Sequence, residues 1–329
     1  MALCCCKAAW RSGWEGSVVI HMKAVCIGSC NIDYTYKVDH FIRPGETDES
    51  VELVVGCGGK GLNQSIALAQ SGVETFHGGL IGEEGKFLID KLKSKNVNTS
   101  YMRFGEGSTG HAIIQVDQKG QNCILLFGGT NKQFTTDFID EILADFDPGD
   151  LVVLQNEINH IPYIIESAAS KGLRVVFNAA PYRDEIRKYP LEKVSWLVVN
   201  EVEGAGLAGV EDPDRIMECL RLRYPDTGIL LTLGKEGCLY RSDTENIRMP
   251  ACKVQVVDTT AAGDTFIGFF IRGIIQGSKA EESLKLATVA SSIAITKPGA
   301  ADSVPEYQQV IDSDLYKNFD AQTGQDAAM

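Results

Sequence analysis

The sequence predicts an α/β fold in which a central, mainly parallel β-sheet is flanked by helices and carries a small β-sheet lid. Three patterns predict it: short apolar runs typical of strands buried on both faces, segments of helical length between them, and two pairs of alternating strands that suit a separate sheet. The chain has 329 residues, 44% hydrophobic and 23% charged, which is enough to form a full core.

The first part of the chain supplies one central strand and the lid. A buried strand is predicted at "KAVCIG" (23–28), followed by alternating stretches at "YTYKVDHFI" and "SVELVVG" on either side of Pro44-Gly45. A helix is expected over 61–71, and "HAIIQVDQKGQNCILLF" is a hairpin that should join the same small sheet. The lid segments are therefore predicted at about 34–56 and 109–128.

The second part of the chain alternates between strands and helices. Strands are expected at "DLVVLQ", "RVVFN", "VSWLVVN" and "GILLTLG", and helices at 161–171, 212–223, 263–277 and 279–296. Strands that alternate with helices predict a parallel sheet covered on its faces.

We expect one domain over residues 23–318, with the lid segments inserted into it. Residues 1–22 lack the sustained apolar core and cleavage site of a secretory peptide, and Met22 stands directly before the first strand. The sequence therefore predicts an extension outside the fold at 1–22 and a polar tail at 319–329.

The charge and the cysteines restrict the partners and the location. The formal net charge is −13, so phosphate backbones and anionic lipids are repelled, and we expect neither nucleic acid nor membrane as partner. The ten cysteines form no C-x-x-C pair, and the five histidines lie far apart, so zinc-binding spacing is absent. Free thiols of this kind predict a reducing, cytoplasmic location.

A glycine-rich segment, "GCGGKG" at 56–61, fits the G-x-G-x-x-G pattern of a dinucleotide-binding turn. The strand before it belongs to the alternating pair, however, and the acidic residue expected about twenty positions on has no convincing candidate, since Glu74 comes too early. The segment could instead bind another ligand, because Gly58 and Gly59 let a ligand approach the main chain, and Asn63 would aim a carboxamide at the same ligand.

Three small residues precede a carboxylate in "DTTAAGDTFIGFF" (258–270). A helix that begins near Gly263 leaves its first amides unpaired, and the small side chains of Ala261 and Ala262 let an anion reach them. Asp264 could simply cap this helix. A cap has no need of three small residues before it, whereas an anion hole beside a catalytic base does.

The segments "GGKGLNQSIALAQSG" and "DTTAAGDTFIGFF" resemble the two signature motifs of the ribokinase family of sugar and nucleoside kinases. The resemblance runs from Lys23 to about Val310. It implies a ribokinase-like fold and an ATP-dependent kinase that phosphorylates the 5-hydroxyl of D-ribose to give D-ribose 5-phosphate and ADP. Magnesium and potassium ions are the cofactors that it implies, and ATP is the co-substrate.

The resemblance also implies the catalytic and sugar-binding residues. Asp264 would be the general base and touch the sugar, and the amides of Ala261, Ala262 and Gly263 would stabilise the transferring phosphoryl group. The motif "GSCNID" resembles a sugar-binding turn. The implied sugar ligands are Asn31, Asp33, Gly58, Gly59, Lys60, Asn63 and Glu157, although no catalytic task follows for Lys60.

Nucleotide and metal ligands follow from the same resemblance. The nucleotide set is Asn200, Glu203, Thr232, Gly234, Gly237, Gly263 and Thr288, and Glu203 would also hold Mg²⁺ through water. Thr288 stands where some relatives carry a larger side chain near adenine, which leaves the nucleotide preference open. The implied potassium ligands are Asp258, Thr260, Ala294, Lys297, Gly299 and Ser303.

Other functions remain open on the sequence alone. The acceptor could be another pentose, a ketohexose, a 2-keto sugar acid or a nucleoside, since Tyr34, Tyr36 and Phe41 could hold a base. A non-catalytic sugar-binding protein is a further alternative, and a nicotinamide dehydrogenase would leave "AAGD" unexplained. The lid strands have alternating apolar faces, and lids of this family pair across a dimer, so we expect a homodimer.

Overall fold

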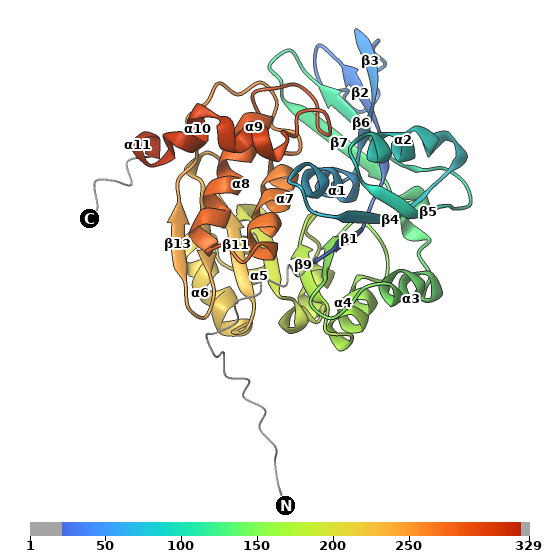
Figure 1. The fold of residues 1–329 in the computed structure, drawn as a ribbon. Helices are drawn as coiled ribbons and strands as arrows, with labels where there is room; N and C mark the ends of the chain where they lie inside the picture. Colours follow the sequence, from blue (N-terminus) through green and yellow to red (C-terminus); the bar gives the residue numbers. More distant parts are fainter. Residues whose placement is uncertain (1–21, 324–329) are drawn as a thin grey trace, which may run out of the picture.

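A computed structural model describes residues 22–323 (Figure 1). Within them the central sheet has nine strands. From one edge to the other these are β13 (Asn246–Met249), β12 (Cys238–Arg241), β11 (Gly228–Thr232), β10 (Trp196–Asn200), β9 (Arg174–Asn178), β8 (Leu151–Gln155), β1 (Ala24–Ile27), β4 (Thr75–Ile81) and β5 (Asn98–Phe104). The strands from β11 to β5 are parallel, and β12 and β13 form an antiparallel edge. The predicted mainly parallel sheet is confirmed.

The small second sheet has four strands in the described residues, in the order β3 (Glu52–Gly58), β2 (Asn31–Lys37), β6 (Gly110–Val116) and β7 (Asn122–Phe127). β2–β3 and β6–β7 are antiparallel pairs, and a parallel β2–β6 contact joins them. Both predicted strand pairs therefore belong to one lid, which projects from the domain (Figure 1). In "GSCNID", residues 28–30 form the connection between β1 and β2, and β2 begins at Asn31, which pairs with Gly58.

Helices cover both faces of the central sheet and enclose two apolar cores. One core contains side chains of α1 (Lys60–Gln70), α2 (Lys86–Ser94), α7 (Ala262–Ile275) and α8 (Ala280–Ala294). The other contains side chains of α3 (Thr136–Ala144), α4 (Ile161–Ser170), α5 (Glu201–Ala208) and α6 (Pro213–Arg223). The short helices α9 (Tyr307–Asp312), α10 (Asp314–Lys317) and α11 (Phe319–Thr323) follow α8.

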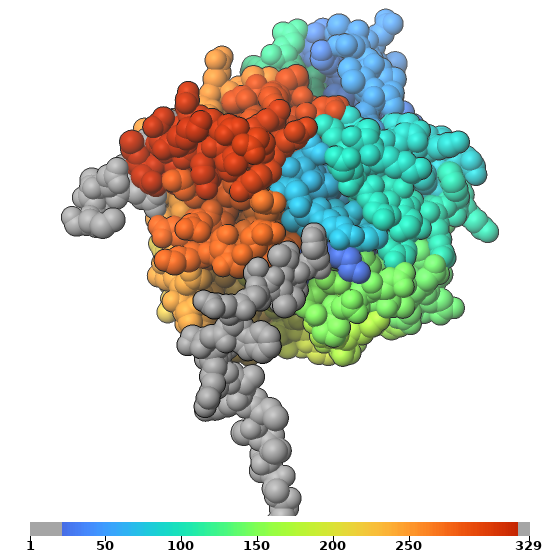
Figure 2. Space-filling model, viewed as in Figure 1, coloured from blue at the N-terminus to red at the C-terminus, as the bar shows by residue number. Residues whose placement is uncertain are grey.

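Helices α1 and α7 lie against each other although they are far apart in the sequence. In the space-filling view the orange C-terminal helices directly contact the light-blue segment that includes α1 (Figure 2). Gly268 permits this contact, because a Cβ there would lie 2.5 Å from the Cβ of Ala67. Gly28, which follows β1, permits a similar contact, because a Cβ at Gly28 would lie 2.7 Å from the Cα of Gly61. Backbone contacts thus fix α1 between the sheet and α7.

The ends of the packed domain differ slightly from the prediction. Met22 contacts the first core, and its sulfur accepts a 2.9 Å hydrogen bond from Arg174. Phe319 is fully buried, so the packed part extends beyond the expected boundary at 318. The rest of the predicted extension (1–21) and residues 324–329 of the predicted tail lie outside the described residues.

None of the described helices combines the length and the apolar character that crossing a membrane requires.

Candidate active site

The predicted site residues gather at the carboxyl edge of the parallel strands. Asn200 and Thr232 are the last residues of β10 and β11, and Glu157 follows β8 by two residues. The strand order reverses between β1 and β8. Ligands of open α/β sheets bind in the crevice that such a reversal creates.

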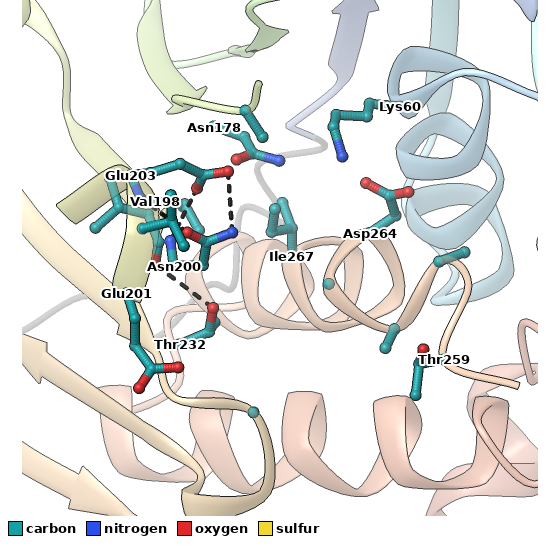
Figure 3. A pocket seen from close by; sticks show the side chains of 17 residues that line it. Lys60, Asn178, Val198, Asn200, Glu201, Glu203, Thr232, Thr259, Asp264 and Ile267 are labelled. Carbon is teal, nitrogen blue, oxygen red and sulfur yellow. Dashed lines mark hydrogen bonds between the residues drawn. The ribbon is translucent and has the colours of Figure 1, made fainter. Parts of the chain in front are cut away.

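Two adjoining cavities open at this edge. The first, about 440 Å³, is lined by Lys60 and Asp264 on one side and by Asn200, Glu203 and Thr232 across from them (Figure 3). The second, about 910 Å³, lies between residues 250–256 and α8. Both are lined by Thr232, Gly234, Thr259, Ala262 and Gly263, so the two cavities adjoin. Their volumes are those of small-molecule sites, roughly 300–1,000 Å³.

Asp264 lies in the first turn of α7, and its carboxylate does not cap the helix. The N-cap is Ala261, in the left-handed conformation with φ 58°, and no side chain caps α7. Asp264 instead accepts hydrogen bonds from Asn63 (Nδ2 to Oδ2, 3.1 Å) and Gln64 (Nε2 to Oδ1, 2.9 Å) of α1. The capping alternative is therefore wrong, and the carboxylate faces the first cavity.

The small residues before Asp264 form the wall between the two cavities. Ala262 and Gly263 line both, and Ala261 lines the first. A Cβ at Gly263 would meet no atom within 4 Å, so this position is open to a ligand. The amide of Ala262 donates to the carbonyl of Thr259 (3.2 Å), so it is engaged in the turn that leads into the helix.

Lys60 is the cation of the first cavity, and its amino group points towards Asp264 (Figure 3). Burial lowers the pKa of Lys60, but the nearby carboxylates of Asp264, Glu157 and Glu203 outweigh burial and raise the pKa above its ordinary value. Lys60 is therefore charged at neutral pH. A permanent cation beside a carboxylate can hold the anionic end of a nucleotide.

Glu203 and Asn200 form a reciprocal cap at the start of α5. Asn200 Oδ1 accepts from the amide of Glu203 (2.9 Å), and Glu203 accepts from the amide of Asn200 (2.8 Å). Burial raises the pKa of Glu203. A buried carboxylate that lines the first cavity fits a Mg²⁺ ion that keeps its waters, as Mg²⁺ does.

The predicted sugar ligands form a connected cluster between the lid and α1. Asn31 Oδ1 accepts from Asn131 Nδ2 (2.7 Å), which orients the Asn31 carboxamide. Gly58 lies against the Asp33 carboxylate, which occupies the space that a Cβ would need. Burial, and then the charge of Glu157, raises the pKa of Asp33 to about 7.

Glu157 connects this cluster to the first turn of α1. Its Oε2 accepts from the amide of Lys60 (3.0 Å) and from the hydroxyl of Ser29. The Ser29 hydroxyl also accepts from the amide of Gly61 (3.2 Å). Gly59 has φ 93°, and its Cβ would lie 2.9 Å from the carbonyl of Ser29, so no other residue fits this turn.

The predicted potassium ligands come from the loop before α7 and from the end of α8 with the loop after it, and the structure brings these segments together. Asp258 accepts from the amide of Gly299 (2.9 Å) and from the amide (2.8 Å) and hydroxyl (2.6 Å) of Thr260. Although burial acts in the opposite direction, these bonds lower the pKa of Asp258. The Ser303 hydroxyl donates to Ala300 (2.9 Å), and the amide of Lys297 to Ala294 (3.1 Å). One ionised carboxylate among carbonyl and hydroxyl oxygens fits a hard monovalent cation.

The predicted nucleotide residues line the cavities. Thr288 and Gly237 line the second cavity, and Gly234 lines both. Gly237 has φ 96°, and the carbonyl of Met249 occupies the space of a Cβ. The Thr288 hydroxyl has no hydrogen-bond partner among the described residues. No cluster of three or more His, Cys, Asp or Glu suited to a metal occurs in residues 22–323.

Several polar residues of the site were missed by the sequence analysis. They are Ser29, Gln64, Asn131, Gln155 and Asn178: the first three bond to a predicted residue, Gln155 bonds to Gln64, and Asn178 lines the first cavity. For Ser29 and Gln64 a signal existed, because they lie within the quoted motifs "GSCNID" and "GGKGLNQSIALAQSG". Nothing local marks Asn131 and Gln155, because their roles depend on contacts between segments about 100 residues apart.

A carboxylate at a helix N-terminus, next to a cavity with one lysine and room for a nucleotide, defines the site of a small-molecule kinase. The family model described as pfkB family carbohydrate kinase matches residues 22–307. The chain belongs to this family, and it is an ATP-dependent sugar kinase. The nicotinamide dehydrogenase alternative is therefore wrong.

The chain is similar to several sugar kinases, and the similarity extends over nearly the whole length of each. Ribokinase of Staphylococcus aureus is 34% identical over 301 residues, covering 88% of this chain and 98% of the relative. Deoxyribokinase of Salmonella typhi is 31% identical over 298 residues, covering 88% and 97%. The structure of Arabidopsis thaliana ribokinase with ribose and ATP superimposes with a TM-score of 0.78 at 28% identity, covering 89% and 98%.

Proposed function

We propose that the protein transfers the γ-phosphoryl group of ATP to the 5-hydroxyl of D-ribose, giving D-ribose 5-phosphate and ADP. One observation carries the proposal: Asp264 stands at the start of α7, where it bonds to the predicted sugar ligand Asn63 and lines the first of the two adjoining cavities. This is the position from which a base can reach a hydroxyl while the phosphates occupy the helix N-terminus.

The proposed reaction is an in-line phosphoryl transfer. The sugar oxygen forms a bond to the γ-phosphorus, the bond from that phosphorus to the β-phosphate oxygen breaks, and the hydroxyl proton passes to Asp264. The transition state is loose and proton loss is late, so a carboxylate of ordinary basicity suffices. The N-terminal amides of α7 and the ammonium group of Lys60 stabilise the charge on the phosphoryl oxygens.

Two cations complete the proposed site. Glu203 would hold magnesium through water, and the ion would neutralise charge on the nucleotide phosphates. The loops of Asp258 and Gly299 would hold potassium, which would brace the turn before α7, because Asp258 lies three residues before the N-cap Ala261. Asn200, Thr232, Gly234, Gly237, Gly263 and Thr288 would bind the nucleotide.

Ribose is the proposed acceptor because carboxylate and carboxamide groups dominate the cluster of Asn31, Asp33 and Asn63. Each such group satisfies neighbouring hydroxyls that apolar side chains would leave unpaired. The similarity to a deoxyribokinase makes 2-deoxyribose the second candidate acceptor.

We further propose a cytoplasmic homodimer that pairs through the lid. Large apolar side chains are exposed on β3 and β7, including Leu53, Val55, Leu125 and Phe127. The seven cysteines of the described residues are all free thiols, which supports a reducing compartment.

Release of ADP tests the function. The purified protein is assayed with Mg²⁺-ATP and KCl against ribose, 2-deoxyribose, fructose, 2-keto-3-deoxygluconate and adenosine. We expect turnover on ribose and, in Asp264→Asn, a loss of kcat of about 10³-fold or more, since general-base catalysis contributes roughly 10²–10⁴-fold. Potassium dependence is tested by replacing KCl with NaCl.

The alternatives give different results in the same assay. Turnover on another acceptor would keep the kinase mechanism and transfer the specificity to that acceptor. Binding of ribose without any turnover would favour the non-catalytic sugar-binding alternative.

A further inference from the structure

The two oxygens of the Asp264 carboxylate are held by two different side chains of α1. Oδ1 accepts from Gln64 Nε2 (2.9 Å) and Oδ2 from Asn63 Nδ2 (3.1 Å). Asn63 belongs to the predicted sugar ligands, whereas nothing in the proposed reaction uses Gln64. Gln64 is fully buried, and its carboxamide is the polar group that touches Oδ1.

Gln64 is itself held by a second buried glutamine. Gln155, at the carboxyl end of β8, donates from Nε2 to Gln64 Oε1 (2.7 Å). An ionised carboxylate only accepts hydrogen bonds, so Gln64 must turn its NH₂ group to Asp264 and its oxygen to Gln155. Gln155 is fully buried beside Cys26 of β1, with 3.4 Å between Nε2 and Sγ. Gly28 makes room for it, because a Cβ there would collide with Gln155 Oε1.

The two amides that hold Asp264 are therefore not equivalent. Gln64 is bonded through both its nitrogen and its oxygen, and it can leave Oδ1 only by losing its place in the Gln155–Gln64–Asp264 chain. Asn63 is bonded to Asp264 through its nitrogen, but its Oδ1 is buried without a hydrogen-bond partner among the described residues. A buried acceptor without a partner is costly, and a sugar hydroxyl would satisfy it.

We propose that Gln64, backed by Gln155, is a positioning residue that fixes the catalytic base through Oδ1 and leaves Oδ2 as the oxygen that takes the sugar proton. In the absence of sugar, Asn63 donates its hydrogen bond to Oδ2. When the sugar binds, the Asn63 side chain turns away from Oδ2 to contact the sugar. The 5-hydroxyl then donates to Oδ2, and its proton passes to that oxygen as the bond to phosphorus forms. This inference rests on the proposed function and adds the geometry of its base.

The surroundings of the base determine which variants test this. Lys60 of α1, Glu203 of α5 and Cys26 of β1 are the titratable groups whose electrostatic interaction with Asp264 the structure records. None of them is altered by replacing a glutamine with methionine. Methionine has nearly the length of glutamine and no NH₂ group, so Gln64→Met and Gln155→Met remove the donors and retain the packing.

Kinetics of the full-length protein with ribose, Mg²⁺-ATP and KCl test the proposal. We expect Gln64→Met to lower kcat by about 10- to 100-fold, because a base displaced by an ångström costs that much. The dissociation constant of ribose, measured by calorimetry, should change less than threefold. Gln155→Met should lower kcat by a smaller factor, and the double variant should be no slower than Gln64→Met, because both act through one chain. Gln70→Met is the control, since Gln70 of α1 bonds to Lys95 away from the site.

A pH profile separates positioning from general damage. Hydrogen bonds to an ionised carboxylate favour the charged form. Without the Gln64 donor the base protonates more readily, so the acidic limb of the kcat profile should move to higher pH in Gln64→Met and remain in place in Gln70→Met.

The outcomes distinguish this inference from the function on which it rests. Wild-type turnover on ribose is measured first, and its absence overturns both. Normal wild-type turnover with an unchanged kcat and pH profile in Gln64→Met overturns the inference alone. A loss in Gln64→Met that comes with weaker ribose binding and an unmoved acidic limb overturns it too, because it would mean a sugar contact or a packing defect. Thermal unfolding of each variant confirms that it is folded.

Discussion

Among the individual side chains, Asp33 and Asp258 show how the surroundings can raise the pKa of one carboxyl group and lower the pKa of another. Burial and then Glu157 raise the pKa of Asp33 to about 7. Asp258 is also partly buried, but three hydrogen bonds from Thr260 and Gly299 lower its pKa. The first carboxyl therefore changes its charge near neutral pH, and the second stays ionised for a cation.

The pKa of Asp33 predicts that ribose binding depends on pH. The ionised carboxylate accepts hydrogen bonds from two hydroxyl groups, whereas the protonated group loses part of this capacity. With a pKa of about 7, Asp33 is mostly protonated at pH 6 and mostly ionised at pH 8. We expect the dissociation constant of ribose to fall by up to about tenfold between these values, as titration of one group allows. Calorimetry across this range measures it.

The control for this prediction is Asp33→Asn, which cannot ionise. Its ribose affinity should be weaker at pH 8 and independent of pH between 6 and 8. A pH dependence that persists in this variant would assign the effect to another group.

Among the helices and strands, the short apolar strands of the central sheet and the helices α1, α4, α6, α7 and α8 were predicted from the sequence, whereas α2, α3, α5, β4, β5, β12 and β13 were not. The strands β1, β8, β9, β10 and β11 are short apolar runs, and all were predicted close to their observed bounds. Strand β4, "TFHGGLI", was missed because two glycines and a histidine interrupt its pattern. Helix α5, "EVEGAGLA", contains two poor helix formers, and the cap between Asn200 and Glu203 stabilises its start.

The same difference holds for the site. Residues within the two glycine-containing motifs, such as Asn63 and Asp264, could be predicted because the motif carries them. Gln155 and Asn131 could not, since their partners lie 91 and 100 residues away in the sequence. Only the folded arrangement of β8, α1 and the lid brings such pairs together.

The close contact between α1 and α7 predicts that Gly268→Ala damages both stability and activity. The new Cβ would lie 2.5 Å from Ala67 Cβ and 2.7 Å from its backbone carbon, so no side-chain rotation relieves the overlap. Overpacking of this kind costs about 1–3 kcal/mol, which exceeds the gain of about 1 kcal/mol from replacing glycine by alanine in a helix. We expect a lower free energy of unfolding in urea and a lower kcat, since α7 also carries Asp264.

Gly263→Ala is the stability control in the same helix, because a Cβ there meets no atom within 4 Å. Its free energy of unfolding should equal or exceed that of the wild type. An equal loss in both variants would mean that the contact with Ala67 does not determine the stability.

For the protein as a whole, the apolar surface of the lid predicts self-association. Leu125 on β7 is 67% exposed, with Ile124, Leu126 and Phe127 exposed beside it. We expect the wild type to sediment as a dimer at micromolar concentration, and Leu125→Glu to sediment as a monomer, because a charge in an apolar interface must be desolvated without a partner.

The matched control for the lid is Leu222→Glu. Leu222 is 78% exposed on α6 and outside the lid. This variant should remain a dimer. A monomeric wild type, or a dimer that Leu222→Glu disrupts and Leu125→Glu does not, would contradict pairing through the lid.

The pairing of α1 with α7 also has a consequence for the synthesis of the protein. Asn63 and Gln64 leave the ribosome well before Asp264, which lies 200 residues after Gln64 in the sequence. The buried amides of α1 can form their hydrogen bonds to Asp264 only after α7 has been made. A nascent chain, or a fragment that ends before α7, therefore contains the residues of the lid and of all nine strands of the central sheet but has no base. The proposed transfer of a phosphoryl group is thus confined to chains that include α7.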